Sequence, residues 1–379
     1  MGRGGLRALG PSATSGPDAV VRFAGANCAG QCEHLNGGRV RSLEWLRAAK
    51  QRAFPKGVRR WAAAQRARVL DRTSERDFRR CFEKLKIAPG SVICVHAAMS
   101  GFGYLADGMA SVFSALRTAV PDCTVVMPSF PFGDSTAAYL QSDPVFDRDA
   151  TPSQSGALSE VFRRLPDVRR GYHPTHACLA LGPQADSLID GTEWSRTPFG
   201  DDSTYGRYSR LPNTVLLLLH TNSTSHVHRL QELVSWPNLF LPGLVPARGY
   251  DSSRQVRTYE VCIHRPRLPL YAVLPATRGD ITYLWLPDYA VQFPAECRQR
   301  VLARLGDSRA TDLLTARQES FVSAGIMTTA RCGHGEVMAI DLQPWQTRLC
   351  DDLRQSFAEW PDAYSLERLT DAGEKGLLG

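Results

Sequence analysis

The residues best suited to acid–base chemistry in this chain are histidines placed beside strand-like segments. His173 precedes Pro174, which disfavours a helix at His173 and fixes the backbone beside it. His176 lies three residues after His173, at the start of a short apolar run. An imidazole accepts protons readily near neutral pH. The pattern indicates a rigidly held base at the mouth of a strand; the alternative is a core histidine bonded to a backbone carbonyl.

A second polar segment runs from Ser225 to Glu232 and contains His226, His228 and Gln231. An imidazole base is usually oriented by a carboxylate, and Glu232 is the carboxylate of this segment. On a strand, His226 and His228 would share one face and could form a metal pair. No Cys or Asp at ligand spacing accompanies them, so no metal is expected.

A third segment is the loop that reads Val95-His96-Ala97-Ala98-Met99-Ser100-Gly101-Phe102-Gly103. A strand ends here in small, polar and glycine residues, and a helical pattern follows. Such a loop exposes backbone N–H groups and lets a phosphate approach closely. An ordinary strand-to-helix connection has a similar composition, so the loop alone does not decide between the two.

The elements that must position these residues alternate between strands and helices. Short apolar runs at 91–96, 123–127, 176–181 and 214–219 are typical of buried strands. Between them, apolar residues at helical spacing predict helices over 109–116 and 158–165. This alternation predicts an α/β fold, an α/β/α layered sandwich with a central mixed sheet and helices on both faces.

The segments outside this region predict further organisation. Residues 1–40 are expected to be poorly ordered or irregular, and residues 41–379 to form one catalytic unit. Residues 42–88 carry a helical pattern that is broken at Pro55, and Thr73 begins a segment that could open a helix from a capping residue. Within 240–345 we expect a smaller packed subdomain with antiparallel strands near 258–262 and 281–286 and a helix over 293–305. A last helix is expected over 345–360.

Composition restricts the class of protein. The chain has 379 residues, of which 43% are hydrophobic and 22% charged, which is ordinary for a globular protein. It has no apolar run of membrane-spanning length, and its first residues lack the apolar core of a secretory signal. We therefore expect a cytoplasmic protein that binds neither membrane nor nucleic acid.

The charge is unevenly distributed along the chain. Residues 1–90 hold 19 Lys and Arg against 7 Asp and Glu, whereas the remainder holds 26 against 31. A basic region can attract phosphates, nucleic acids or acidic proteins, or it can be a solvated arginine-rich helix face. The ten cysteines include no CxxC pair. Cys28, Cys32 and His34 could form a zinc cluster, but ordinary thiols are the favoured interpretation.

Four segments in register resemble the aminoglycoside 3-N-acetyltransferase family over about residues 80–235. They are the loop from Val95 to Gly103; Met127-Pro128-Ser129-Phe130; Phe146-Asp147 with Thr151-Pro152-Ser153 and Gly156-Ala157-Leu158; and His173-Pro174-Thr175-His176-Ala177 followed by Pro198-Phe199-Gly200-Asp201. The resemblance implies the α/β/α fold and transfer of an acetyl or other acyl group from acetyl-CoA or another acyl-CoA to an amine of an aminoglycoside-like molecule. Such proteins serve antibiotic resistance or antibiotic biosynthesis.

The resemblance also implies roles for individual residues. His173 is expected to be the general base, with Glu232 and His228 as further catalytic residues. The expected coenzyme A residues are His96, Ala97, Ala98, Met99, Ser100, Gly103, Ser129 and Ser153. The expected acceptor-binding residues are His176, Asp201, Ser225 and Gln231.

Two departures from the family pattern leave other functions open. The family segment T-x-x-H-x-x-E corresponds to Ser225, His228 and Gln231, which places Glu232 one position late. Ala97 and Ala98 stand where the family has serines. The alternatives are an acyltransferase of natural-product or polysaccharide biosynthesis that uses a carrier-protein thioester or a non-aminoglycoside acceptor, and a non-catalytic binding protein of the same fold. An acyl carrier protein is thus a further candidate partner.

Overall fold

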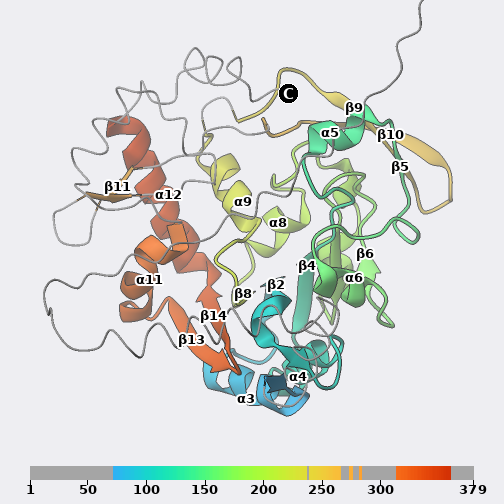
Figure 1. Ribbon diagram of the computed structural model, residues 1–379. Helices are drawn as coiled ribbons and strands as arrows, with labels where there is room; N and C mark the ends of the chain where they lie inside the picture. Colours follow the sequence, from blue (N-terminus) through green and yellow to red (C-terminus); the bar gives the residue numbers. More distant parts are fainter. Residues whose placement is uncertain (1–70, 237–238, 266–272, 276–280, 284–312, 360–379) are drawn as a thin grey trace, which may run out of the picture. The chain divides into compact units, whose positions relative to one another are not determined.

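The computed structural model describes residues 71–236, 239–265, 273–275, 281–283 and 313–359 (Figure 1). Their centre is a seven-stranded sheet in the order β13-β14-β8-β2-β4-β7-β6. The central strands β2 (Val92–Ala97), β4 (Thr124–Pro128) and β8 (Thr214–Leu219) run parallel to one another. The flanking strands β7 (Cys178–Leu181), β6 (Arg169–Arg170), β14 (Gly335–Asp341) and β13 (Met327–Cys332) each run antiparallel to their inner neighbour. The sheet is therefore mixed, as the sequence predicts.

The central strands are apolar on both faces because helices cover both. Successive strand residues point to opposite faces. In β8, Leu216 and Leu218 accordingly join one buried cluster, whereas Leu217 and Leu219 join the other. A strand buried on both sides needs a continuous apolar sequence, which is what residues 214–219 supply.

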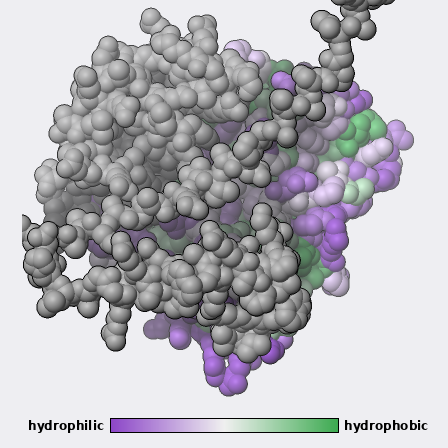
Figure 2. Space-filling view, viewed as in Figure 1, coloured by the Kyte–Doolittle hydropathy of each residue, from purple (hydrophilic) through white to green (hydrophobic). Residues whose placement is uncertain are grey.

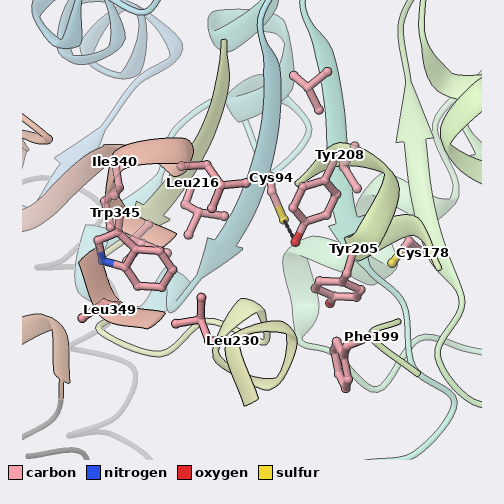
Figure 3. Packing of buried hydrophobic residues seen from close by; sticks show 14 of the residues in the cluster. Cys94, Cys178, Phe199, Tyr205, Tyr208, Leu216, Leu230, Ile340, Trp345 and Leu349 are labelled. Carbon is pink, nitrogen blue, oxygen red and sulfur yellow. Dashed lines mark hydrogen bonds between the residues drawn. The ribbon is translucent and has the colours of Figure 1, made fainter. Parts of the chain in front are cut away.

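One face of the sheet is covered by α7 (Ala185–Ile189), α8 (Thr204–Tyr208), α9 (His226–Leu233), α11 (Leu313–Ser323) and α12 (Leu342–Glu359). Figure 3 shows part of this layer, with Trp345 of α12 and Tyr208 of α8 packed against the strands. In the same layer the Cys94 thiol donates a hydrogen bond to the Tyr208 hydroxyl at 3.5 Å. This side of the core thus contains a pair of polar groups that are bonded to each other.

The other face is covered by α3 (Glu75–Leu85), α4 (Ser111–Ala119) and α6 (Ala157–Arg163). Helix α3 begins as the sequence predicts, because Ser74 caps it and the Asp77 carboxylate accepts the Ser74 N–H. Phe113 of α4 stacks on Phe162 of α6 with ring centroids 4.3 Å apart. The described residues therefore form the predicted α/β/α sandwich.

A separate three-stranded sheet has the order β10-β9-β5, where β9 is Val245–Tyr250, β10 is Val256–Val261 and β5 is Val145–Phe146. The prediction for 240–345 differs from the structure in its boundary. Strands β13 and β14 fall inside that range but belong to the main sheet, because β14 pairs with β8. The predicted helix over 293–305 lies outside the described residues, as do residues 1–70 with Cys28, Cys32 and the predicted helices before Asp71.

The remaining described elements are short and connect the larger ones. They are β1 (Arg72–Thr73), η1 (Met99–Phe102), β3 (Tyr104–Leu105), α5 (Thr136–Gln141), η2 (Thr192–Trp194), β11 (Val273–Pro275) and β12 (Ile281–Tyr283). Hydrophilic residues cover most of the described surface on the face that Figure 2 shows. Among the described helices, none has the length and apolar character that crossing a membrane requires.

Candidate active site

The sequence segments whose residues could take part in catalysis or binding meet at one edge of the main sheet. Parallel strands β2, β4 and β8 end there, and the loops after their last residues begin at Ala98, Ser129 and His220. Strand β7 runs the other way, so the segment from His173 to Ala177 enters the sheet at the same edge. Open α/β sheets bind ligands outside the carboxyl ends of their parallel strands. The fold thus gathers the predicted residues where a site is expected.

The larger of two clefts at this edge has a volume of about 580 Å³. Four predicted donor-binding residues line it, namely Ala97, Met99, Ser100 and Gly103. The other lining residues are Tyr104, Leu105, Gly108, Met109, Ala157 and Leu158. None of these ten described residues carries a charge, so the cleft suits an uncharged chain of atoms better than a diphosphate.

The smaller cleft, of about 170 Å³, shares Ala97 and Leu158 with the larger one. His96 and four hydroxyl residues, Ser155, Ser159, Thr221 and Ser223, supply its polar lining. Burial lowers the pKa of His96 to about 4, which keeps that ring neutral at pH 7. This cleft therefore offers neutral hydrogen-bonding groups.

The predicted donor-binding residues Ala98, Ser153 and Ser129 do not line either cleft but lie next to residues that do. The Ala98 N–H is already bonded to the Leu219 carbonyl at 2.8 Å. The Ser153 hydroxyl bonds to that of Ser159 at 2.8 Å, and Ser159 donates to the Pro128 carbonyl at 2.6 Å. The Ser129 hydroxyl is buried with no hydrogen-bond partner among the described residues.

The loop after β2 is shaped by close glycine packing. A Cβ atom added to Gly101 would lie 1.8 Å from Cδ2 of His220. His220 itself adopts a left-handed backbone conformation with φ of 53°, and its backbone N–H donates to the Glu336 carbonyl at 2.7 Å. Any side chain at position 101 must therefore displace the imidazole of His220, the loop or the end of β8.

His173 lies shortly before β7, at the strand mouth as predicted, but it is buried, with 2% of the residue exposed. Its Nδ1 accepts from the backbone N–H of His176 at 3.0 Å and of Thr175 at 3.3 Å. In the neutral ring the proton is then on Nε2, which donates to the Ser195 carbonyl at 3.2 Å. Both nitrogens serve the backbone, so these bonds disagree with the predicted role of His173 as a base.

His176 is half-buried and lies among aromatic rings. The ring centroids of Phe130, Phe132 and Phe199 are 4.8, 5.3 and 5.1 Å from that of His176. Its Nδ1 shares a hydrogen bond of 2.9 Å with the Thr175 hydroxyl. Burial, followed by the neighbouring histidines, keeps the pKa of His176 well below its usual range. At pH 7 His176 is a neutral imidazole.

His226 and His228 lie on helix α9 rather than on a strand, so they do not share a face as a metal pair would. His226 is fully buried and bonds to Tyr208 at 2.9 Å and to Gln346 at 3.0 Å. His228 bonds through Nδ1 to Oε1 of Gln231 at 2.8 Å. Within the described ranges, no three His, Cys, Asp or Glu side chains are grouped as metal ligands.

Glu232 forms no hydrogen bond or ion pair with His173 or His228. Its Oε1 accepts the Phe199 N–H at 3.0 Å and lies 2.8 Å from Nε2 of His264. The one-position shift from Gln231 turns the carboxylate toward a different element, the segment after β10. The Gln231 Nε2 is buried with no partner among the described residues, and the Ser225 carbonyl accepts the His228 N–H at 3.1 Å.

Asp201 supports the site from the surface. Its carboxylate pairs with Arg229 of α9 and, at 3.2 Å, with Arg210. Buried Arg229 also donates to the Phe199 carbonyl at 3.1 Å. Asp201 thus holds the loop of Phe199 against α9, and its carboxylate is occupied by arginine rather than directed at an acceptor.

Buried Arg170 fixes the segments on the other side of β4. It donates to the Ser129 carbonyl at 2.8 Å and the Arg148 carbonyl at 3.1 Å, and also to the Thr151 carbonyl. Burial lowers the pKa of Arg170 to about 10, so the side chain is charged at pH 7. One cation therefore ties the end of β4 to residues 148–151.

Sequence reasoning missed His264 and the central position of Phe199. The rings of His176, His228 and His264 all lie within 5.3 Å of the Phe199 ring, measured between centroids. We define these four residues and Glu232 as the histidine group. His264 follows β10 in a segment with no motif of its own, so no signal in the sequence singles it out.

The sequence and fold match known proteins. A family model described as aminoglycoside 3-N-acetyltransferase matches residues 94–347. Aminoglycoside N(3)-acetyltransferase IV from Salmonella is 35% identical over 156 residues, which are 40% of this chain and 57% of that protein. Aminoglycoside N(3)-acetyltransferase VIII from Streptomyces fradiae is 29% identical over 153 residues, which are 37% and 53% of the two chains. The matched region thus spans little more than half the length of these relatives.

Structural similarity extends over more of the chain. The crystal structure of aminoglycoside acetyltransferase AAC(3)-Xa superposes with a TM-score of 0.57 over 79% of this chain and 99% of that one, at 19% identity. The apoenzyme of AAC(3)-IVa gives a TM-score of 0.51 over 80% and 97% of the two chains, also at 19% identity. At this level of identity the similarity establishes the fold.

Proposed function

Because this chain belongs to the aminoglycoside 3-N-acetyltransferase family, we propose that it transfers an acetyl or other acyl group from a coenzyme A thioester to an amine of an aminoglycoside-like molecule. One observation carries the proposal. The end of β4 connects the smaller cleft with the histidine group, since Pro128 lines that cleft and Phe130 packs on His176. The Ser155 hydroxyl, which also lines that cleft, accepts the Phe130 N–H at 2.8 Å. A thioester in the cleft would thus face the histidine group.

The two clefts suit the pantetheine arm of the donor. The larger cleft has an uncharged lining of small and apolar residues, which fits a flexible chain with few charges. The smaller cleft presents hydroxyls of Thr221 and Ser223, which can donate to the oxygen of a thioester carbonyl. Donors placed where an oxyanion develops are among the strongest contributions to acyl transfer.

In this proposal His176 is the base that acts on the attacking amine. When the Thr175 hydroxyl donates a hydrogen bond to His173 Nδ1, the same hydroxyl oxygen accepts a hydrogen bond from His176 Nδ1–H. This order of donors leaves the Nε2 lone pair of His176 unprotonated. The lowered pKa of His176 keeps the ring in that state at pH 7.

The reaction needs no covalent enzyme intermediate. The amine nitrogen bonds to the thioester carbonyl carbon, and His176 takes a proton from the nitrogen of the tetrahedral adduct. The C–S bond then breaks, and that proton passes to the departing thiolate. His173 holds the backbone of residues 175–176 in place and so acts as a positioning residue.

The predicted alternatives differ in donor and acceptor. A carrier-protein thioester presents the same pantetheine arm, so the uncharged cleft suits either donor. The pairing of His228 with Gln231 instead of a carboxylate is a specific reason to test amines outside the aminoglycosides. The binding-protein alternative predicts tight ligand binding without turnover.

Thiol release separates these possibilities. The purified protein is incubated with acetyl-CoA and a panel of aminoglycosides and simpler amines, and then with an acetylated carrier protein in place of coenzyme A. We expect release that depends on the acceptor, with mass spectrometry showing one added acetyl group. Binding of coenzyme A by calorimetry without release from any donor–acceptor pair would refute acyl transfer and favour the binding protein.

A further inference from the structure

His264 and Glu232 form an imidazole–carboxylate pair inside the histidine group. The Nε2 and Oε1 atoms are 2.8 Å apart, and the side chains are 15% and 7% exposed. The bond joins α9 to the segment after β10, where His264 forms an isolated bridge with Phe240. The Phe199 N–H, a bonding partner of the same carboxylate, brings the pair to the centre of the group.

The three imidazoles of the group have different partners. His176 bonds to a hydroxyl and His228 to an amide, and burial lowers the pKa of both, in His228 to about 4. His264 alone among the three bonds to a carboxylate, which stabilises an imidazolium and orients the ring. His264 is therefore the member of the group whose ring is oriented by a carboxylate, as the ring of an imidazole base usually is.

Acyl transfer to an alkylamine requires two proton removals. At pH 7 such an amine is an ammonium and must lose one proton before it can attack, and the adduct loses a second. Under the proposed function, His176 takes the second proton and returns it to the thiolate. No group in that scheme accepts the first.

We infer that His264, held by Glu232, is a second base that takes the proton from the acceptor ammonium. The inference rests on the proposed function. The N–H bond of the ammonium breaks, its electron pair stays on the amine nitrogen, and the proton moves to Nδ1 of His264. The imidazolium is stabilised by Glu232 and then loses its proton to water, which its partial exposure allows. The net release is one proton per acetyl group transferred.

The groups around His264 decide how a pH experiment is interpreted. Glu232 and His228 face it from α9, and His176 faces it from the segment before β7. Cys262 and Arg265 flank it on its own segment. Because the pKa values of His176 and His228 are lowered, neither of these rings changes charge between pH 7 and pH 9.

The test compares pH dependence in His264→Gln with that of the unaltered protein. The Gln amide can still donate to Glu232 and hold α9, but it cannot accept a proton. We expect turnover at pH 7 to fall about 10²-fold, the lower end of the usual effect of a lost base. The deficit should shrink roughly tenfold per pH unit toward the amine pKa, near 10, because the free amine then forms without help.

Controls separate this role from a structural one. Coenzyme A binding by calorimetry should match that of the unaltered protein. His334→Gln removes an imidazole–carboxylate pair with Asp71, whose atoms are 3.1 Å apart. His334 is 72% exposed and is not part of the histidine group, so this variant should change neither the rate nor its pH profile. Glu232→Gln should give a smaller deficit of the same pH dependence.

A deficit that is the same at every pH, or no deficit, would overturn the role of His264 while leaving acyl transfer intact. Absence of thiol release by the unaltered protein, with every acceptor and donor, would overturn the proposed function and the second base together. Recovery of His264→Gln at alkaline pH, with normal donor binding, supports the inference.

Discussion

Replacing His173 and replacing His176 should separate stability from catalysis. His173 is 2% exposed and bonds through both nitrogens to the backbone, at 3.0 Å to the His176 N–H and 3.2 Å to the Ser195 carbonyl. His173→Ala leaves both groups buried without a partner, at about 1–3 kcal/mol each. We therefore expect the free energy of unfolding to fall by about 2–6 kcal/mol, a large part of the usual 5–15 kcal/mol.

His176→Gln should have the opposite pattern. The side chain is half-buried and has one hydrogen bond, with Thr175, so the loss of stability should be about 1 kcal/mol. Turnover should fall by about 10²–10⁴-fold, the usual range for a lost general base. The measurements are urea unfolding followed by tryptophan fluorescence, and initial rates of thiol release with acetyl-CoA.

His173→Gln is a second variant at this position, for the case in which His173→Ala does not fold. A Gln amide can donate to the Ser195 carbonyl and accept from the His176 N–H, so this variant should keep most of its stability and turn over within about tenfold of the unaltered protein. A His173→Gln protein that unfolds at the same urea concentration as the unaltered one but loses more than about 10²-fold in rate would refute the argument, because it would return the role of base to His173.

Three further perturbations test other parts of the structure. Gly101→Ala should weaken coenzyme A binding at least tenfold by calorimetry, because the added Cβ meets His220. Gly133→Ala is the control, since its added Cβ lies 4.0 Å from the nearest atom. Equal affinities of the two variants for coenzyme A would refute the proposed donor loop. Arg170→Met should lower the free energy of unfolding by about 2–4 kcal/mol, since three charge-assisted hydrogen bonds are lost while a buried charge is also removed; an unchanged urea midpoint would contradict this. The free energy of unfolding should also fall between pH 7 and pH 5, because burial lowers the pKa of several histidines to about 4 or below. Each of these rings is neutral in the folded protein but takes up a proton in the unfolded chain. The loss at pH 5 is up to about 2 kcal/mol per histidine. A flat profile of urea midpoints would refute the buried neutral state.

The strands and the sandwich could be predicted because their physical causes are local. Residues 214–219 are continuously apolar, and a strand with that sequence must be covered on both faces. Ser74 and Asp77 form a capping box within four residues, so the local sequence also fixes where α3 starts. The family resemblance likewise rests on contiguous motifs, and the family model confirms it.

The boundary of the predicted subdomain was harder to place, because strand pairing is a long-range property. Strand β14 pairs with β8, although more than a hundred residues separate them. Nothing in residues 335–341 distinguishes a strand that joins the main sheet from one that joins a smaller one. Only the packed structure decides which edge is available.

Local sequence patterns identified the residue types that could do chemistry and the strand ends beside which several of them stand, since strand ends and short motifs are local features. How the histidines divide their roles depends on folding. His173 and His176 are three residues apart, yet one bonds to the backbone through both nitrogens and the other lies half-buried among aromatic rings. Glu232 likewise reaches His264 across 32 positions of sequence because helix α9 turns its carboxylate toward that segment. Protonation and hydrogen bonding depend on burial and on partners brought together by folding, and these have no signature in the order of the residues.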